Sequence, residues 1–197
     1  MKPLILEHIE ALGYKVFDSD NYDLNLFGIR IGKDSNKFDD IVGCAYKDEG
    51  AWRVEYWRAT TDPGFFYLEN PHNIKGTAIL VPGQYRGVWS LDYHQGKSLA
   101  LCQRNGEVKV YRDANRDRIL NMNKDTISEG FYGINIHQAG KISSRVDRWS
   151  AGCQVLARQT DFERLLFLCK RQIEIHGWDK FTYTLLDASE LNNKRFV

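Results

Sequence analysis

The chain has 197 residues, of which 43% are hydrophobic and 27% are charged. Those fractions are ordinary for a globular protein, and the length allows one domain with a full hydrophobic core. Lys and Arg number 27 against 26 Asp and Glu, a formal net charge of +1, so bulk electrostatics give no reason to expect nucleic acid or an anionic membrane surface as a partner.

The start of the chain and its cysteines bear on where the protein works. The apolar run at residues 4–6 ends at Glu7, too early for a secretory signal peptide, and no stretch is long enough for a membrane span. We expect a protein that is cytoplasmic as synthesised and not inserted in a membrane. The cysteines form no CxxC pair and are too sparse for a disulfide scaffold, so we expect reduced, mostly buried thiols. They are Cys44, Cys102, Cys153 and Cys169.

The first forty residues are expected to contain a short helix and a polar extension. Ile5 and Ile9 share one face of a helix over residues 3–12, and Gly13 follows as its stop. A strand candidate at residues 26–31 interrupts the polar stretch that follows.

From residue 41 onward the pattern is that of short strands rich in aromatic residues and separated by Gly, Asn or Pro. Trp52, Val54 and Tyr56 alternate with charged residues, which is the period of a half-buried strand. The predicted strands cover residues 41–46, 51–58, 65–68, 77–81, 86–92, 98–103 and 107–112. Their spacing favours a sandwich or a barrel-like core.

Residues 160–176 form the clearest predicted helix. Thr160 and Glu163 have the spacing of a capping box, and an apolar face repeats every three or four residues. That face consists of Phe162, Leu165, Leu166, Cys169 and Ile173. Gly177 ends the helix, and residues 181–186 are predicted to be a final strand.

No internal repeat, low-complexity run or linker divides the chain. We therefore predict one mainly β domain over residues 1–197. Its parts are an N-terminal helix and extension (1–40), a catalytic β core (41–157) and a C-terminal helix and strand (158–197).

A polar strand face precedes the most informative loop of the sequence. Residues 131–137 have a strand pattern in which Ile134 and Ile136 face the core. Asn135 and His137 face the other way, and this small polar side is expected outside the packed interior. His137 is therefore expected at a strand end, beside a loop.

Cys153 is the candidate nucleophile. It lies sixteen residues after His137, the natural base, and the glycine before it lets the backbone approach a substrate and aim N–H groups at an oxyanion. Cations in the intervening loop are expected to favour the reactive thiolate. These cations are Lys141, Arg145 and Arg148. On spacing alone, an inert buried cysteine remains the alternative.

The run from His137 to Ser150-Ala151-Gly152-Cys153 resembles the signature of YkuD-type L,D-transpeptidases, a histidine followed after a loop by Ser/Thr-His-Gly-Cys. The resemblance covers residues 40–157. It implies a β-sandwich with a short N-terminal helix and a C-terminal helix, and attack on peptidoglycan stem peptides through a cysteine acyl-enzyme. By position it makes Cys153 the nucleophile, His137 its activator, Gly152 part of the oxyanion turn and Ser150 a hydrogen-bonding support.

The sequence departs from that family at Ala151, where a second histidine is usual, and at Val155, where Arg or Asn is usual. The family's Thr-Pro segment is also not evident. These departures leave open transfer to an amine acceptor, hydrolysis by water, and a non-catalytic cell-wall-binding or virion-associated module on the same fold. The chain also resembles small phage-encoded proteins of similar length, so phage-mediated access is one route to the wall.

Substrate contacts are expected from Trp149, Arg148, Gln138 and His94. Trp149 directly precedes the Ser-Ala-Gly-Cys turn, where its ring either packs on a sugar or peptide or anchors the loop. His94 either lines a cleft or is a solvated loop histidine.

One stretch resembles half of a calcium-binding loop. Oxygen donors stand at Asp113, Asn115, Asp117 and Asn121. Arg118 occupies the position of the usual glycine, and Asx-rich turns also arise for backbone reasons alone. We expect no required cofactor, with a structural Ca²⁺ as the alternative.

Overall fold

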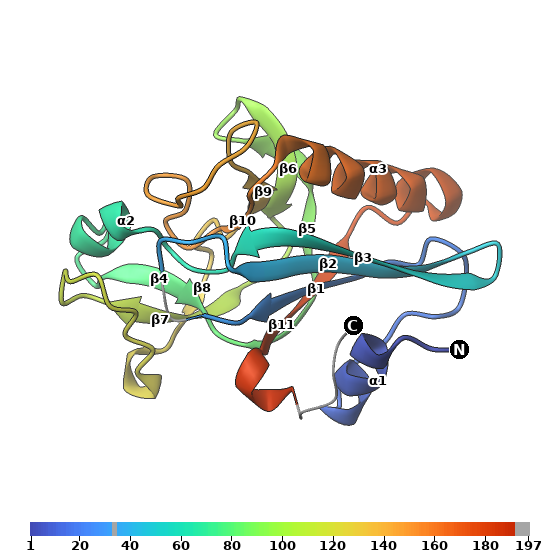
Figure 1. Ribbon diagram of the computed structural model, residues 1–197, viewed down its shortest axis with the longest axis horizontal. Helices are drawn as coiled ribbons and strands as arrows, with labels where there is room; N and C mark the ends of the chain where they lie inside the picture. The colour runs from blue at the N-terminus through green and yellow to red at the C-terminus, as the bar shows by residue number, and fades with distance from the viewer. Residues whose placement is uncertain (33–34, 192–197) are drawn as a thin grey trace.

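A closed barrel of eight strands dominates the computed structural model, which describes residues 1–32 and 35–191 (Figure 1). Around the barrel the strands follow the order β1-β11-β5-β6-β9-β10-β3-β2. Neighbours are antiparallel except for two parallel pairs, β1 with β11 and β9 with β10. The barrel strands are β1 (Asn25–Arg30), β2 (Asp40–Asp48), β3 (Ala51–Thr60), β5 (Gly83–His94), β6 (Ser98–Gln103), β9 (Ile136–Gln138), β10 (Gln154–Leu156) and β11 (Phe181–Asp187).

A second, three-stranded sheet accompanies the barrel, with the strand order β4-β7-β8. Its strands are β4 (Thr77–Leu80), β7 (Val108–Asp113) and β8 (Ser128–Gly130). The short helix α2 (Phe65–Glu69) lies at the same end of the molecule, at left in Figure 1. Two single turns of 3₁₀ helix, η1 (Lys124–Thr126) and η2 (Ala188–Glu190), complete the elements.

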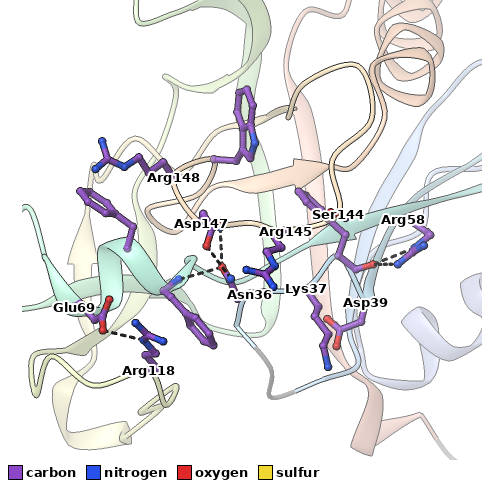
Figure 2. A pocket seen from close by; sticks show the side chains of 14 residues that line it. Asn36, Lys37, Asp39, Arg58, Glu69, Arg118, Ser144, Arg145, Asp147 and Arg148 are labelled. Atoms are coloured by element: carbon purple, nitrogen blue, oxygen red, sulfur yellow. Dashed lines mark hydrogen bonds and ion pairs between the residues drawn. The ribbon is translucent and has the colours of Figure 1, made fainter.

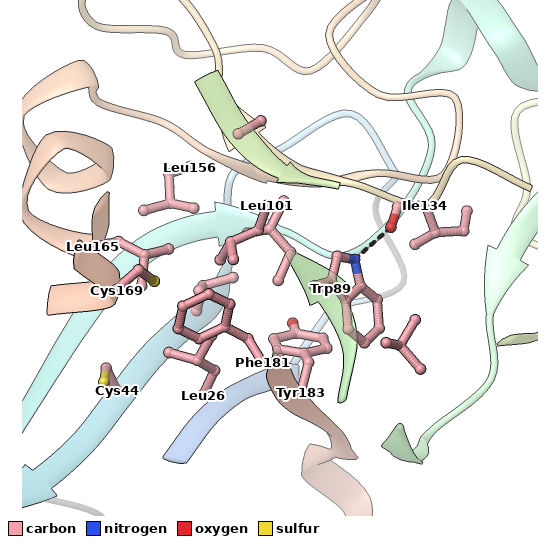
Figure 3. Packing of buried hydrophobic residues seen from close by; sticks show 14 of the residues in the cluster. Leu26, Cys44, Trp89, Leu101, Ile134, Leu156, Leu165, Cys169, Phe181 and Tyr183 are labelled. Carbon is pink, nitrogen blue, oxygen red and sulfur yellow. Dashed lines mark hydrogen bonds between the residues drawn. The ribbon is translucent and has the colours of Figure 1, made fainter. Parts of the chain in front are cut away.

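Two helices cover different sides of the barrel (Figure 1). α3 (Gln159–His176) buries Leu165 and Cys169 against the main apolar cluster, in which the ring of Trp89 is fully buried (Figure 3). α1 (Leu4–Ala11) packs into a separate cluster through Ile5, Leu6 and Ile9. Each large apolar side chain buried in this way stabilises the fold by about 1.5–3 kcal/mol. In the part of the chain that the structure describes, no helix is both long and apolar enough to cross a membrane.

The predicted mainly β fold with few helices is confirmed, and its main sheet is a closed barrel. Residues 65–68, predicted as a strand, instead form α2 after the extended Gly64. Of residues 131–137, predicted as a strand, only 136 and 137 are in β9, because Gly133 has a φ of +67° that breaks the extended backbone before them. The predicted capping box is also wrong, since α3 begins at Gln159 and its N-cap has no side-chain hydrogen bond.

A buried arginine ties the barrel to the three-stranded sheet. Nε of Arg30, at the end of β1, lies 2.8 Å from Asp62 Oδ1, and both side chains are almost fully buried. Its Nη1 donates to Leu80 O of β4 at 3.0 Å, and its Nη2 donates to Thr61 O at 2.9 Å. The N–H and hydroxyl of Thr61 in turn donate to Asp40 Oδ2. Burial raises the pKa of Asp62 to about 7, although the charge of Arg30 opposes this shift.

Replacing Arg30 by Leu is expected to destabilise the protein far more than replacing Asp62 by Asn. The first change leaves two carboxyl groups buried without their cation, a loss of about 3–5 kcal/mol. The second leaves Arg30 bonded to its two carbonyl acceptors. Chemical unfolding of both variants gives the two free energies. An equal or larger loss for Asp62→Asn would contradict the central place given to Arg30.

Candidate active site

The pairing of β9 with β10 brings the two halves of the His-Cys motif together. In parallel register, Ile136 is paired with Gln154 and His137 with Val155. Ile136 belongs to the main apolar cluster, so alternation along the strand directs His137 and Val155 to the outer face of the barrel. Cys153 lies one residue before β10 and shares that face. The two candidate catalytic residues are thus diagonal neighbours on adjacent strands.

Ser150 and Gly152 shape the turn that presents Cys153. The buried Ser150 hydroxyl donates to Cys153 O at 2.8 Å and accepts from the Gly152 N–H at 3.1 Å. Gly152 has a φ of +122°, and a Cβ there would lie 2.3 Å from Ala78 O of β4. The backbone N–H of Cys153 donates to no acceptor within residues 1–32 and 35–191. It is therefore available to an oxyanion that develops beside the thiol.

The thiol of Cys153 is the most accessible of the four, while Cys44, Cys102 and Cys169 are buried as expected. Its Sγ lies 3.5 Å from Gly133 O. Burial raises the pKa of this thiol to about 11, and a backbone N–H that faces the sulfur only partly offsets the shift. Cys153 is therefore a neutral thiol at pH 7.

The expectation that loop cations favour the thiolate is wrong. The guanidinium of Arg148 stacks over the ring of Phe66 at 3.8 Å. Arg145 and Arg148 both line a groove whose wall does not include Cys153. No cation is among the groups that shift the pKa of this thiol, which is raised rather than lowered.

His137 is only 7% exposed, so the expectation that its polar strand face lies outside the packed interior is wrong. Ala139 and Val146, from the loop after β9, pack with Val155 on the same face, and the ring of His94 stacks on that of His137. His137 Nδ1 lies 2.8 Å from Gln138 O. Because a carbonyl oxygen only accepts, Nδ1 carries the proton and Nε2 keeps a lone pair. Burial lowers the pKa of His137 to about 4, with a smaller contribution from His94.

Cys153 and His137 therefore form a neutral pair at rest. No hydrogen bond joins their side chains in the part of the chain that the structure describes. The pKa of about 11 for the thiol and of about 4 for the imidazole leave both uncharged at pH 7. An imidazole with a free Nε2 is the form that accepts a proton from an attacking thiol, and such contacts commonly shorten when substrate binds.

The ring of His94 lies on His137 rather than in a solvated loop. His94 ends β5, and the two imidazoles stack with centroids 4.5 Å apart and planes 18° apart. Asn135 Nδ2 lies 2.8 Å from His94 Nδ1. No local sequence signal marks this contact, because it depends on how β5, β6 and β9 pair in the barrel.

Two grooves flank the turn from Trp149 to Cys153. The larger, of about 1190 Å³, is lined by Trp149 and Arg148 together with residues of α2 (Figure 2). The ring of Trp149 is 46% exposed there. The smaller, of about 300 Å³, reaches Ala151 on the other side of the turn. Gln138 lines neither groove and contributes its carbonyl to His137.

Asn36 fastens the loop between β9 and β10 at Asp147, as Figure 2 shows. Its Oδ1 accepts from the Asp147 N–H at 2.7 Å, and its Nδ2 donates to Asp147 Oδ1 at 2.8 Å. These two bonds hold Asp147 at a φ of +39°, a conformation that side chains rarely adopt. The loop conformation is therefore fixed from outside the loop.

The side-chain oxygens of the possible calcium loop accept hydrogen bonds from backbone N–H groups of the same loop. Asp113 Oδ2 accepts from the Asn121 N–H at 2.9 Å, and Asn115 Oδ1 accepts from the Asp117 N–H at 3.2 Å. Asx turns thus account for these oxygens. Among the described residues, no group of three His, Cys, Asp or Glu is placed to hold a metal ion.

A scan against protein-family models, a search of curated proteins and a search of solved structures found no match to this chain. The likeness to L,D-transpeptidases therefore stays a prediction that rests on the His137 to Cys153 motif. The chemistry of the site has to be argued from its own geometry.

Iodoacetamide is expected to alkylate Cys153 before the other three cysteines of the folded protein, because only this thiol is partly accessible. The rate should rise about tenfold per pH unit between pH 7 and pH 10, since the thiolate is the reactive form. Peptide mapping by mass spectrometry measures each site, with Cys153→Ala as the control. A rate that does not change with pH over this range would contradict the neutral thiol.

Gly152→Ala is expected to lower both stability and Cys153 reactivity, because the added carbon meets Ala78 O. Gly50→Ala, in the turn between β2 and β3, is the matched control, since its φ is also positive, at +78°, but a Cβ there meets nothing within 4 Å. The control bears only the left-handed strain of about 1–2 kcal/mol. Thermal unfolding and alkylation rates compare the two variants. Equal losses would show that the contact with β4 does not shape the turn.

Proposed function

We propose that this protein is a cysteine-dependent enzyme that acts on peptidoglycan stem peptides through a Cys153 thioester, with His137 as the base. The proposal includes an L,D-transpeptidase-like arrangement of the β core. One observation carries it: the β9–β10 pairing gathers a partly accessible thiol, an N–H with no acceptor among the described residues, and an imidazole with a free Nε2 on one face. Those are the parts that acyl transfer by a thiol requires.

The attack begins with a proton transfer. As the sulfur of Cys153 adds to the scissile carbonyl, its proton passes to His137 Nε2. The hydrogen bond from His137 Nδ1 to Gln138 O keeps the ring in the tautomer that can accept this proton. The free N–H of Cys153 stabilises the oxyanion, and one such donor is typically worth about 10²–10³ in rate.

The tetrahedral adduct then collapses. The C–N bond breaks, the leaving amine takes the proton from His137, and the acyl group remains on Cys153 as a thioester. Water or an acceptor amine next attacks the thioester, giving its proton to His137, which returns it to the sulfur. Hydrolysis and transfer therefore differ only in the nucleophile of the second step.

The choice of stem peptide as substrate rests on the motif from His137 to Cys153. Residues on both sides of Cys153 in the chain line grooves that a peptide can enter, Trp149 the larger and Ala151 the smaller, although Cys153 is in the wall of neither. Trp149 and Arg148 are the proposed contacts in the larger groove. No role toward substrate is proposed for Gln138, whose carbonyl acts on His137.

A second candidate function is a non-catalytic cell-wall-binding or virion-associated module. It is favoured by the neutral thiol and by the lack of a hydrogen bond from Cys153 to His137. The half-exposed Trp149 ring in a groove of that size would suit a glycan or peptide strand without chemistry.

Incubation with purified peptidoglycan, followed by mass spectrometry of released fragments, tests the two functions. The wild type should release or transfer stem-peptide fragments, and Cys153→Ala should release none. His137→Gln should lose about 10²–10⁴ in rate, the usual contribution of a general base. Added amine acceptors separate transfer from hydrolysis by the mass of the product.

Cys44→Ala and His176→Gln are the matched controls, because Cys44 is buried and His176 lies on α3 against Asn21 O. Both should keep wild-type rates. Retention on peptidoglycan by wild type and Cys153→Ala alike, without any released fragment, would reject the enzyme and support the binding module.

A further inference from the structure

We propose that His94 is a positioning residue for the base. Its neutral ring, fixed by Asn135, holds the ring of His137 so that Nε2 stays free for the thiol of Cys153. This inference rests on the proposed function. It assigns a role to a side chain of β5, a strand outside the motif from His137 to Cys153.

The orientation of the Asn135 amide is fixed by a backbone group. The Gln103 N–H donates to Asn135 Oδ1 at 2.9 Å, and an N–H can only donate. The other end of the amide, Nδ2, therefore faces His94 Nδ1 at 2.8 Å. Because an amide nitrogen also only donates, His94 Nδ1 must hold a lone pair. His94 is thus neutral, with its proton on Nε2.

The stacking of the two imidazoles then decides which of them takes a proton. Their centroids are 4.5 Å apart, so two positive charges there would repel each other strongly. Protonation of His94 at Nδ1 would also break its bond to Asn135. His137 is therefore the ring that becomes charged when Cys153 gives up its proton. The neutral ring of His94 stacks against it and holds its orientation.

The other ionisable groups around this pair fit the same assignment. Arg104 is the cation that acts on His94, and it is itself paired with Asp92 at 2.6 Å. Of the thiols on β6 and before β10, Cys102 acts on Cys153, and both have raised pKa values. Burial and Arg104 lower the pKa of His94, as a ring locked in its neutral form requires.

Nuclear magnetic resonance of ¹⁵N-histidine-labelled protein tests the geometry without a substrate. The wild type should show the Nε2–H tautomer for His94, the Nδ1–H tautomer for His137, and a His137 titration near pH 4. In His94→Ala the titration of His137 should move up toward 6.5, its ordinary value. His176→Ala, which removes a ring stacked on Trp178 far from the site, is the control and should leave both spectra unchanged.

Kinetics on peptidoglycan fragments give the second readout. His94→Ala should lower kcat about tenfold or more with KM within about twofold, as expected for a residue that orients a base. The acid limb of the kcat/KM profile should move up from about pH 4 with the His137 pKa. Because exposure of His137 alone would also move that limb, the fall in kcat is compared at pH 8, where His137 is neutral in both proteins.

Asn135→Asp keeps the shape of the site and serves if His94→Ala does not fold. Its carboxylate would face His94 Nδ1 and draw a proton onto it, which should change the tautomer and lower kcat. Turnover by wild type with an unchanged profile in folded His94→Ala, or an unchanged tautomer in Asn135→Asp, would reject the role of His94. Absence of turnover by wild type would instead reject the proposed function itself.

Discussion

The parallel pairing of two three-residue strands is the constraint on which both the barrel and the site depend. β9 joins β6 through Leu101 and Ile136, and β10 joins β3 at only two positions, so this pair closes the barrel. Parallel neighbours need a crossover connection, which here is the loop of residues 139–153. That loop carries the turn before Cys153, and its residues Ala139 and Val146 pack with Val155 on the outer face. Barrel closure and presentation of the thiol therefore follow from one set of backbone hydrogen bonds.

Burial then sets the electrostatics of the site. A covered imidazole resists protonation and a half-buried thiol resists ionisation, so both stay neutral without any nearby charge. Nδ1 of His137 is committed to Gln138 O, which leaves a single direction for proton transfer. A neutral pair of this kind separates charge only when a carbonyl is present to receive the sulfur. Under the proposed function, the chemistry would depend on the presence of substrate rather than on a thiolate formed in advance.

Local patterns in the sequence predicted the long elements, but not the surroundings of the candidate site. Alternation along the hairpin of β2 and β3 and the apolar face of α3 are properties of adjacent residues, and both elements formed as predicted. The spacing from His137 to Cys153 singled out the two residues that β9 and β10 bring together. α2 and β10 depend on tertiary packing, so the residues within them do not predict a helix or a strand. The expectation that the loop cations favour the Cys153 thiolate is wrong because the sequence does not say which way a side chain points. The guanidinium of Arg148 stacks on the ring of Phe66. His94 was assigned to substrate because its stacking partner lies on another strand.

The raised pKa of Cys153 also affects how fast this thiol is oxidised. Hydrogen peroxide oxidises thiolates far faster than thiols, first to the sulfenic acid and then irreversibly to the sulfinic and sulfonic acids. A thiol whose pKa is about 11 presents almost no thiolate at pH 7, and the other three cysteines are buried. The same desolvation that keeps the Cys153 thiol neutral thus protects it from oxidation.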